Sequence, residues 1–536
     1  MPRDVSVQQS TQLPDLYEAG IAELQQGLEK GHFTSVDLVK AYLARIEEVN
    51  LNGAALHAVI ETNPQALTQA AALDTERENN GSRGPLHGIP LLIKDNIATL
   101  HEEGMNTTAG SYALLGSEVA GDAPVAAKLR EAGAIFIGKT NMCEWAAYRG
   151  QVPSGFSGRG GQTVSPYYPN GDPSGSSCGS GVAMAVGLAA GSLGSETDGS
   201  IILPSSNSNI VGIKPTVGLA SRTRVIPISS TQDTVGPMCR SVADAALLLS
   251  FIAGKDESDE ATKSQPEIPD YMKALVEGAL KSKKIGVPRN LMKEKNPVED
   301  DFDKALDILR SLGAEIVDPA DFHNAEELKA PDLGEYEELV LTVELKVGIN
   351  KYISELRKRP PNVNSLADVI KFNNENKDKE LPEPYYTDQS QLYKSEDSKE
   401  DEQYYEAIKK DYELGRTEGI DAALKEFGLD AFVLPSSYSY ARNVTAIAGY
   451  PLVSVPLGFH AETVEPTPDP PTPLHTTAPG TPFGLCFMGT AYSEYHLIGF
   501  AYAFEQATQV RLKGRKAFPE AIPKNQLKDV IVNLRE

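Results

Sequence analysis

The chain has 536 residues, of which 40% are hydrophobic, so it is long enough to bury a large core. Its formal net charge is −24 at pH 7 and its basic residues are scattered. That surface repels a phosphate backbone, so we expect no nucleic-acid partner. The four cysteines form no CxxC pair, and no apolar run approaches the roughly 20 residues of a membrane span. A disulfide framework, a structural zinc site and a spanning helix are therefore excluded, and a cytoplasmic protein is expected.

The first hundred residues predict helices followed by a strand. Apolar residues recur at helical spacing over 15–31 and 35–49, and Thr34 or Ser35 can cap the second helix. A short strand is expected over 57–61 and another helix over 64–76. The next run, 88–95, is apolar up to its last two residues, Lys94 and Asp95. This pattern predicts a buried strand that presents Lys94 at its end.

The following segments alternate between helix and strand patterns. Helical spacing over 124–132 precedes a strand pattern over 134–137, and a Gly/Ser/Pro-rich segment then covers 158–181. The small apolar residues 182–193 predict a buried helix, and 210–213 a strand. Strands that alternate with helices favour an α/β fold with a large mixed sheet covered by helices on both faces.

The stretch after about residue 254 differs in composition. It holds charged helical patterns, 298–312 and 402–427, around a polar segment, 373–401, which predicts a peripheral helical insertion. Strand patterns return at 430–435 and 451–456. The prolines and threonines between them and the last strand predict a mobile, polyproline-like surface loop over 463–482.

Two short motifs suggest other chemistries and fail on their surroundings. Residues 133–140 match the phosphate-loop pattern GxxxxGK[ST], but the four residues between the glycines are strand formers. Residues 175–179 match the GxSxG nucleophile elbow with Ser177 as the nucleophile. That elbow requires a preceding strand, whereas 168–174 are turn formers. We expect neither a nucleotide site nor an α/β-hydrolase elbow.

The serine- and glycine-rich blocks 172–181 and 194–204 are more informative. Flexible linkers are the alternative, but an apolar segment joins the blocks and the second runs into a strand pattern. Together with 88–96, 138–142, 211–216, 233–238 and 449–456, the blocks resemble the amidase signature family in order and spacing. Residues 106–111, 160–163 and 195–200 are most similar to its microbial peptide-amidase branch.

The resemblance implies the site residues. It assigns Ser200 as the nucleophile, Ser176 as a proton relay and Lys94 as the general base, with a cis peptide bond between Gly175 and Ser176. It also implies an oxyanion hole from the backbone N–H groups of Thr197, Asp198, Gly199 and Ser200. Gly175 and Ser177 would support this scaffold. The base must be neutral, so burial has to lower the pKa of Lys94 from about 10.4.

The same resemblance sets the wider expectations. It implies one amidase-signature domain over 1–536, which consists of N-terminal helices 15–78, a signature core 80–255, a variable region 256–430, and a return to the core sheet over 430–536. Neither metal nor cofactor is needed, and the substrate is a peptide C-terminal amide or a small-molecule amide. No membrane is involved, and a monomer or homodimer is expected. The glutaminase component of a tRNA-dependent amidotransferase and a non-catalytic scaffold are the alternatives.

One position departs from the family pattern. Many members carry an arginine two residues after the nucleophile, where it supports the loop through an ion pair. Here that residue is Ile202, while Glu196 and Asp198 remain acidic. The sequence therefore leaves open what neutralises Glu196. Cys178 lies beside the relay serine, but nothing near it in the sequence would activate a thiol.

Overall fold

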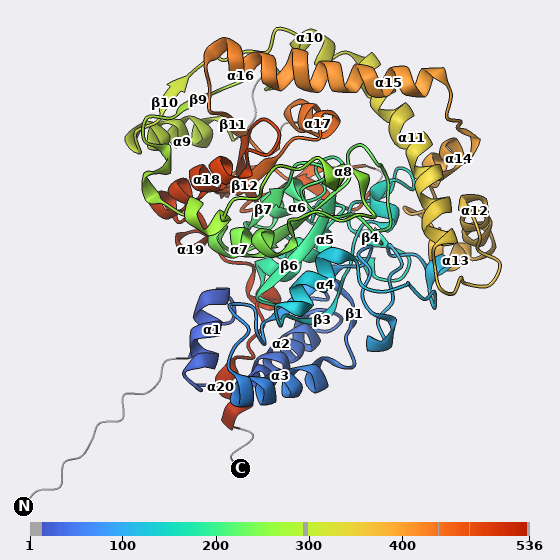
Figure 1. The fold of residues 1–536 in the computed structure, drawn as a ribbon, viewed down its shortest axis with the longest axis vertical. Coiled ribbons are helices and arrows are strands. Elements are labelled where there is room, and N and C mark those ends of the chain that lie inside the picture. The colour runs from blue at the N-terminus through green and yellow to red at the C-terminus, as the bar shows by residue number, and fades with distance from the viewer. Residues whose placement is uncertain (1–12, 293–297, 438, 471, 533–536) are drawn as a thin grey trace, which may run out of the picture.

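The computed structural model describes residues 13–292, 298–437, 439–470 and 472–532. Its centre is one mixed sheet of eleven strands, which confirms the predicted fold class (Figure 1). In order across the sheet the strands are β1 (Val59–Thr62), β3 (Ile135–Thr140), β2 (Pro90–Lys94), β6 (Gly191–Glu196), β8 (Thr234–Cys239), β7 (Val211–Lys214), β12 (Leu452–Phe459), β15 (Pro482–Met488), β11 (Ala431–Pro435), β9 (Lys284–Gly286) and β10 (Glu315–Val317).

Parallel pairing surrounds the strand that carries Lys94. β2 pairs in parallel with both β3 and β6, and all of its residues are buried, as the apolar run predicts. Beyond β6 the pairing of β8, β7, β12, β15 and β11 is antiparallel, and β9 and β10 are again parallel. The carboxyl ends of β2 and β6 consequently meet at one edge of the sheet, which is where an α/β fold builds its binding crevice.

The helices of the first half of the chain pack around this sheet. They are α1 (Ile21–Glu29), α2 (Ser35–Val49), α3 (Ala66–Asn80), α4 (Pro124–Glu131), α5 (Cys178–Ala185), α6 (Ile202–Asn207), α7 (Val242–Ile252) and α8 (Glu260–Lys263). Thr34 caps α2 as predicted, because its side chain accepts from the Asp37 N–H while the Asp37 carboxylate accepts from the Thr34 N–H.

The helices of the variable region form an arc along the upper and right-hand rim in Figure 1, except the first of them, Glu299–Ser311, which lies on the left beside β9 and β10. These helices are α9 (Glu299–Ser311), α10 (Ala325–Leu328), α11 (Pro331–Ser354), α12 (Leu366–Glu375), α13 (Lys377–Glu380), α14 (Ser390–Asp397), α15 (Glu402–Tyr412) and α16 (Asp421–Phe427). A π-helical segment, Glu413–Ile420, interrupts the helix predicted over 402–427. The peripheral helical insertion is thus present, but its longest member, α11, lies beside the site described below.

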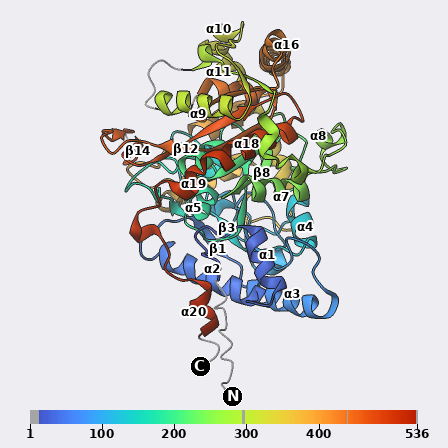
Figure 2. The same ribbon diagram turned by 90° about the vertical axis from the view of Figure 1, so that its left-hand side faces the viewer.

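The C-terminal part returns to the sheet and then to the N-terminal helices. It contributes α17 (Ser439–Ala448), α18 (Glu494–Thr508), α19 (Val510–Lys513) and α20 (Leu527–Val532). α20 packs against α2, so the two ends of the described chain lie on the same side of the molecule (Figure 2). The buried guanidinium of Arg45 holds this junction through the carbonyls of Val186, Gly187 and Asn525.

Three predictions about local structure differ from the structure. The first helix begins at Ile21 and not at residue 15, because 16–18 form a turn. The helix expected over 182–193 ends at Ala185, since Gly187 has a φ of +69° and the chain then enters β6. The proline-rich segment lies at the surface as predicted, but it is not polyproline-like throughout, because Thr467–Pro468 (β13) pairs with His475–Thr477 (β14).

Candidate active site

Lys94 ends β2 inside the protein. Its side chain is fully buried, and its Nζ lies 2.8 Å from the Ser176 Oγ. The same Nζ lies 3.0 Å from both the carbonyl and the hydroxyl of Ser195. Burial lowers the pKa of Lys94 from 10.5 to about 8, although neighbouring acidic groups, Cys143 first, act in the opposite direction. The structure thus places a lysine with an accessible neutral form against a serine hydroxyl.

Ser176 stands at the turn that precedes α5. The peptide bond between Gly175 and Ser176 is cis, and the Ser176 carbonyl accepts from the Cys143 N–H. A Cβ at Gly175 would lie 2.2 Å from the Cys143 Sγ, so only glycine fits there. This close approach fixes the path of the chain into Ser176.

Ser200 lies on the loop between β6 and α6, and its neighbours in the fold come from the other glycine-rich block. The Ser177 N–H donates to the Ser200 carbonyl at 3.1 Å, which joins the two blocks directly. The Ser177 hydroxyl donates to the Ser195 carbonyl at 3.1 Å. Gly199, which precedes Ser200, has a φ of +77°, a conformation that favours glycine. Ser200 itself is 7% exposed.

Ser195 is a contact of Lys94 that the sequence did not single out. Its hydroxyl lies 3.0 Å from Lys94 Nζ and also accepts from the Asn96 side-chain amide at 2.9 Å. Asn96 follows Lys94 by two residues, and Ser195 belongs to the neighbouring parallel strand, β6. The adjacency of β2 and β6 creates this contact, and no local motif signals it.

The acidic side chain of Glu196 is satisfied by the backbone. Its Oε1 accepts from the Gly199 N–H at 2.9 Å, and its Oε2 accepts from the N–H groups of Ile201 and Ile202 at 2.6 and 2.9 Å. The positive charge of Lys214 also lies near enough to lower its pKa, against the larger raising effect of burial. These contacts answer the question that the sequence left open.

This arrangement corrects one member of the predicted oxyanion hole. The Gly199 N–H already donates to Glu196, so it does not point at a free position in this structure. Among the described residues, the N–H groups of Thr197, Asp198 and Ser200 have no acceptor. The candidate donors are therefore these three.

Asp233 anchors the loop that carries Ser200 from the side. The Thr197 hydroxyl donates to Asp233 Oδ1 at 2.6 Å, and Asp233 Oδ2 accepts from the N–H groups of Ile228 and Ser229. Burial raises the pKa of Asp233 to about 6, although these hydrogen bonds favour its ionised form. Asp233 lies in a segment that carries the family resemblance, but its contact with Thr197 depends on the pairing of β6 with β8.

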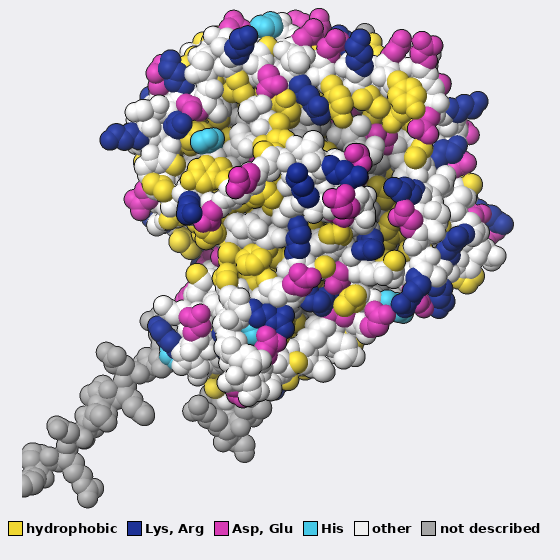
Figure 3. Space-filling view, viewed as in Figure 1, with side chains coloured by type: hydrophobic (Ala, Val, Ile, Leu, Met, Phe, Trp, Pro, Cys, Tyr) yellow, Lys and Arg dark blue, Asp and Glu magenta, His cyan; other side chains and the backbone are white. Residues whose placement is uncertain are grey.

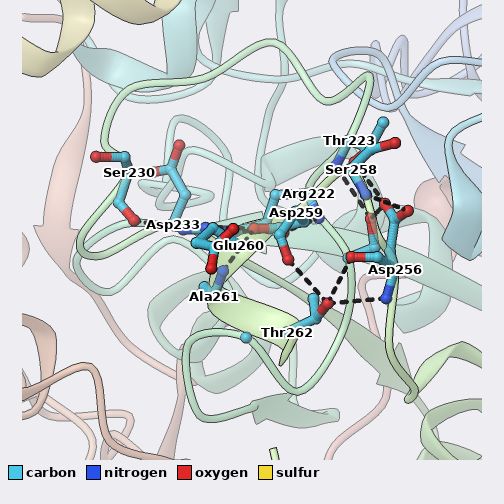
Figure 4. A network of polar contacts seen from close by, with 12 residues as sticks. Arg222, Thr223, Ser230, Asp233, Asp256, Ser258, Asp259, Glu260, Ala261 and Thr262 are labelled. Atoms are coloured by element: carbon cyan, nitrogen blue, oxygen red, sulfur yellow. Dashed lines mark hydrogen bonds and ion pairs between the residues drawn. The ribbon is translucent and has the colours of Figure 1, made fainter. Parts of the chain in front are cut away.

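A cavity of about 610 Å³ has Asp233, the acceptor of the Thr197 hydroxyl, in its wall. Much of the wall comes from loop 222–230 and from α11 with the residues that follow it, and segments 119–120, 258–259 and 400–404 complete it. Arg222 in that wall is held by both carboxylate oxygens of Asp259, at 3.0 and 2.7 Å, as Figure 4 shows. The Thr262 hydroxyl braces the same corner through the Asp259 carbonyl. This network makes loop 222–233 a firm support for Thr197.

The competing interpretations do not agree with the geometry. Residues 135–140 form the strand β3, so the phosphate-loop match shapes no loop. No strand directly precedes Gly175, as the alternative elbow would require. Asp95 accepts from Thr108 and Gly110 instead of pairing with Lys94. No group of three or more His, Cys, Asp or Glu side chains within the described ranges can hold a metal ion.

The face of the molecule in Figure 3 shows no concentration of one charge. Lysines and arginines are interspersed there with aspartates and glutamates. No helix in the part of the chain that the structure describes is long and apolar enough to cross a membrane.

Comparison with known proteins identifies the family. The family model described as Amidase matches residues 37–498. A probable amidase of Arabidopsis thaliana is 42% identical over 509 residues, which cover 92% of this chain and 91% of that protein. The X-ray structure of the native peptide amidase from Stenotrophomonas maltophilia is 40% identical with a TM-score of 0.82, and the match covers 95% of this chain and 99% of that chain.

A different class of relative is less similar. A glutamyl-tRNA(Gln) amidotransferase component from Cereibacter sphaeroides is 32% identical over 532 residues, which cover 93% of this chain and 99% of that protein. The chain therefore belongs to the amidase family and is an amide-hydrolysing enzyme. Within that family it is similar to the peptide amidase over nearly the whole of both chains.

Proposed function

We propose that Ser200 attacks the carbonyl carbon of a linear carboxamide, while Ser176 relays its proton to Lys94. The observation that carries this proposal is the 2.8 Å contact between Lys94 Nζ and Ser176 Oγ in a fully buried environment. The backbone hydrogen bond from Ser177 to Ser200 keeps block 194–204, which carries the nucleophile, against block 172–181, which carries the relay serine. A nucleophile, a relay and a base are thus supplied by three neighbouring segments.

The contacts of Lys94 fit its neutral form. A neutral amine has two N–H donors and one lone pair. When these two N–H groups donate to the carbonyl and hydroxyl of Ser195, the lone pair is left for the Ser176 hydroxyl. In the ammonium form a third N–H donates to Ser176 instead. When Ser200 attacks, its proton passes to Ser176, whose own proton passes to Lys94. The resulting ammonium returns a proton by the same path to the leaving amine or ammonia, and water then repeats the cycle on the acyl-enzyme.

The developing oxyanion requires donors that are already in place. We assign this role to the backbone N–H groups of Thr197, Asp198 and Ser200, which lie on the turn before α6. Glu196 and Asp233 hold the two ends of that turn, through the Ile201 N–H and the Thr197 hydroxyl respectively. The turn is thereby preorganised before substrate binds, which is the main source of oxyanion stabilisation.

The proposed substrate is a peptide C-terminal amide or a small-molecule amide. The similarity to a peptide amidase, at 40% identity and a TM-score of 0.82, supports this class over the amidotransferase relative, at 32% identity. The cycle above uses only side chains and water, so we propose no cofactor. We also propose one catalytic domain, acting as a cytoplasmic monomer or homodimer.

The test measures ammonia released from peptide amides, fatty amides and short aliphatic amides. Ser200→Ala should abolish release and prevent labelling by a fluorophosphonate, whereas Ser311→Ala, at an exposed helix end, should change neither. Absence of both hydrolysis and labelling in the wild-type protein would show a non-catalytic scaffold instead. Activity that requires a co-purified partner protein would identify the glutaminase alternative.

A further inference from the structure

Arg442 reaches the nucleophile turn from α17, 244 residues further along the chain than its partner. Its Nη1 lies 3.1 Å from Asp198 Oδ1, and the Arg442 side chain is only 15% exposed. The same nitrogen would lie 2.3 Å from a Cβ at Gly199. The guanidinium therefore covers the turn at the residue immediately before Ser200.

Apolar packing explains why α17 delivers Arg442 to this position. Ile202, in the first turn of α6, belongs to the same buried apolar cluster as Val444 and Ile447 of α17. An isoleucine at residue 202 thus docks the helix whose arginine contacts Asp198. A charged side chain at residue 202 would be buried in that apolar cluster. Here Ile202 packs in the cluster, and the positive charge that pairs with Asp198 comes from Arg442.

Polar contacts beside Arg442 hold α17 against the helical insertion. The Asn443 side-chain amide donates to Glu337 Oε2 at 3.2 Å, and the Gln232 amide donates to Glu337 Oε1 at 2.9 Å. Glu337 lies on α11, and Gln232 immediately precedes Asp233, which binds Thr197. The insertion, α17 and the loop before β8 are therefore connected through Glu337.

The charges near Arg442 give it an electrostatic role. The pKa of the Glu337 carboxyl is raised to about 7. Burial is the largest cause, and the charge of the nearby Asp198 is the second. Arg442 acts in the opposite direction on the same carboxyl. Since a guanidinium stays charged at every physiological pH, Arg442 supplies a permanent positive charge that acts on both acidic groups. Its removal leaves Asp198 without this partner.

We propose that Arg442 is a positioning residue for amide hydrolysis, which fixes the turn 198–200 by pairing with Asp198 and covering Gly199. This inference rests on the proposed role of Ser200 as the nucleophile. Gly199 has no side chain of its own, so the turn depends on its neighbours. Glu196 accepts from the Gly199 N–H. Arg442 pairs with Asp198 and covers Gly199. These contacts keep the Ser200 hydroxyl and the nearby N–H donors in their direction. Displacement of such groups by about 1 Å can cost roughly 100-fold in rate.

The experiment compares Arg442→Met and Arg442→Lys with the wild-type enzyme on one dipeptide amide. Arg442→Met should reduce kcat about 10- to 100-fold with little change in KM, because the interaction acts on the transition state. Arg442→Lys should recover part of kcat, since lysine keeps the charge but not the planar contact over Gly199. Methylguanidine added to Arg442→Ala should also restore part of kcat.

Two measurements and a matched control separate positioning from general destabilisation. Thermal melting should stay close to that of the wild type, and the rate of fluorophosphonate labelling of Ser200 should fall in parallel with kcat. The matched control is Arg289→Met, which breaks ion pairs with Asp318 and Asp303 at 2.7 and 2.8 Å and should leave kcat unchanged.

The two proposals fail in different ways. An Arg442→Met enzyme with kcat within about twofold of the wild type, or a loss that methylguanidine and lysine do not restore, refutes the positioning role. In either case wild-type hydrolysis and labelling of Ser200 still support the proposed function. A wild-type protein that neither hydrolyses amides nor labels at Ser200 refutes the function itself.

Discussion

The burial of Lys94 predicts that amide hydrolysis increases as the pH rises through about 8. A lysine with a pKa of about 8 is neutral roughly 10% of the time at pH 7, against about 0.03% for a pKa of 10.5. Burial therefore supplies the base form about 300-fold more often at neutral pH. Between pH 7 and pH 9 the neutral fraction rises to about 90%, so kcat/KM should increase about ninefold.

Initial rates of ammonia release from a peptide amide, measured below KM from pH 6 to pH 10, test this expectation. Lys94→Arg is the decisive variant, because a guanidinium cannot lose its proton in this range. It should lower kcat by about three orders of magnitude while the melting temperature shows that the fold survives. A kcat/KM that stays flat between pH 7 and pH 9, or an active Lys94→Arg enzyme, would refute the reasoning.

Three further predictions concern neighbouring groups. Asp233→Asn replaces a carboxylate that accepts from backbone N–H groups and from the Thr197 hydroxyl with an amide. The loop at Thr197 should loosen, and kcat should fall about tenfold. An unchanged kcat would contradict this expectation. Burial, followed by the charge of Glu144, raises the pKa of Glu380 to about 9. The folded state then holds one more proton than the unfolded state between about pH 4.5 and 9, so stability should fall as pH rises across this window, and Glu380→Gln should flatten that fall in melting experiments. Arg45→Met leaves buried carbonyls unpaired and should cost roughly 3–5 kcal/mol in denaturant unfolding, whereas a loss below about 1 kcal/mol would show that water replaces the guanidinium.

The elements that the sequence predicts well are those with a strong local pattern. An apolar run that ends in Lys94 predicts a buried strand, whichever strands it pairs with in the sheet. The structure confirms this strand as β2. The predicted helix over 124–132 is likewise confirmed as α4, with Pro124 at its first position. Boundaries fail where a single residue ends an element, as at Gly187, because its positive φ depends on the packing around it.

The sequence by itself determined the two serine- and glycine-rich blocks, the strand ending at Lys94 and the family to which these motifs belong. Its predictions about the roles of Ser176 and Ser200 remain to be tested by the experiments above. Only the tertiary structure decided which groups surround them. Ser195 reaches Lys94 because β2 and β6 are neighbours, and Arg442 reaches Asp198 from a distant helix. Such contacts arise from strand order and helix docking, which no local pattern of residues encodes.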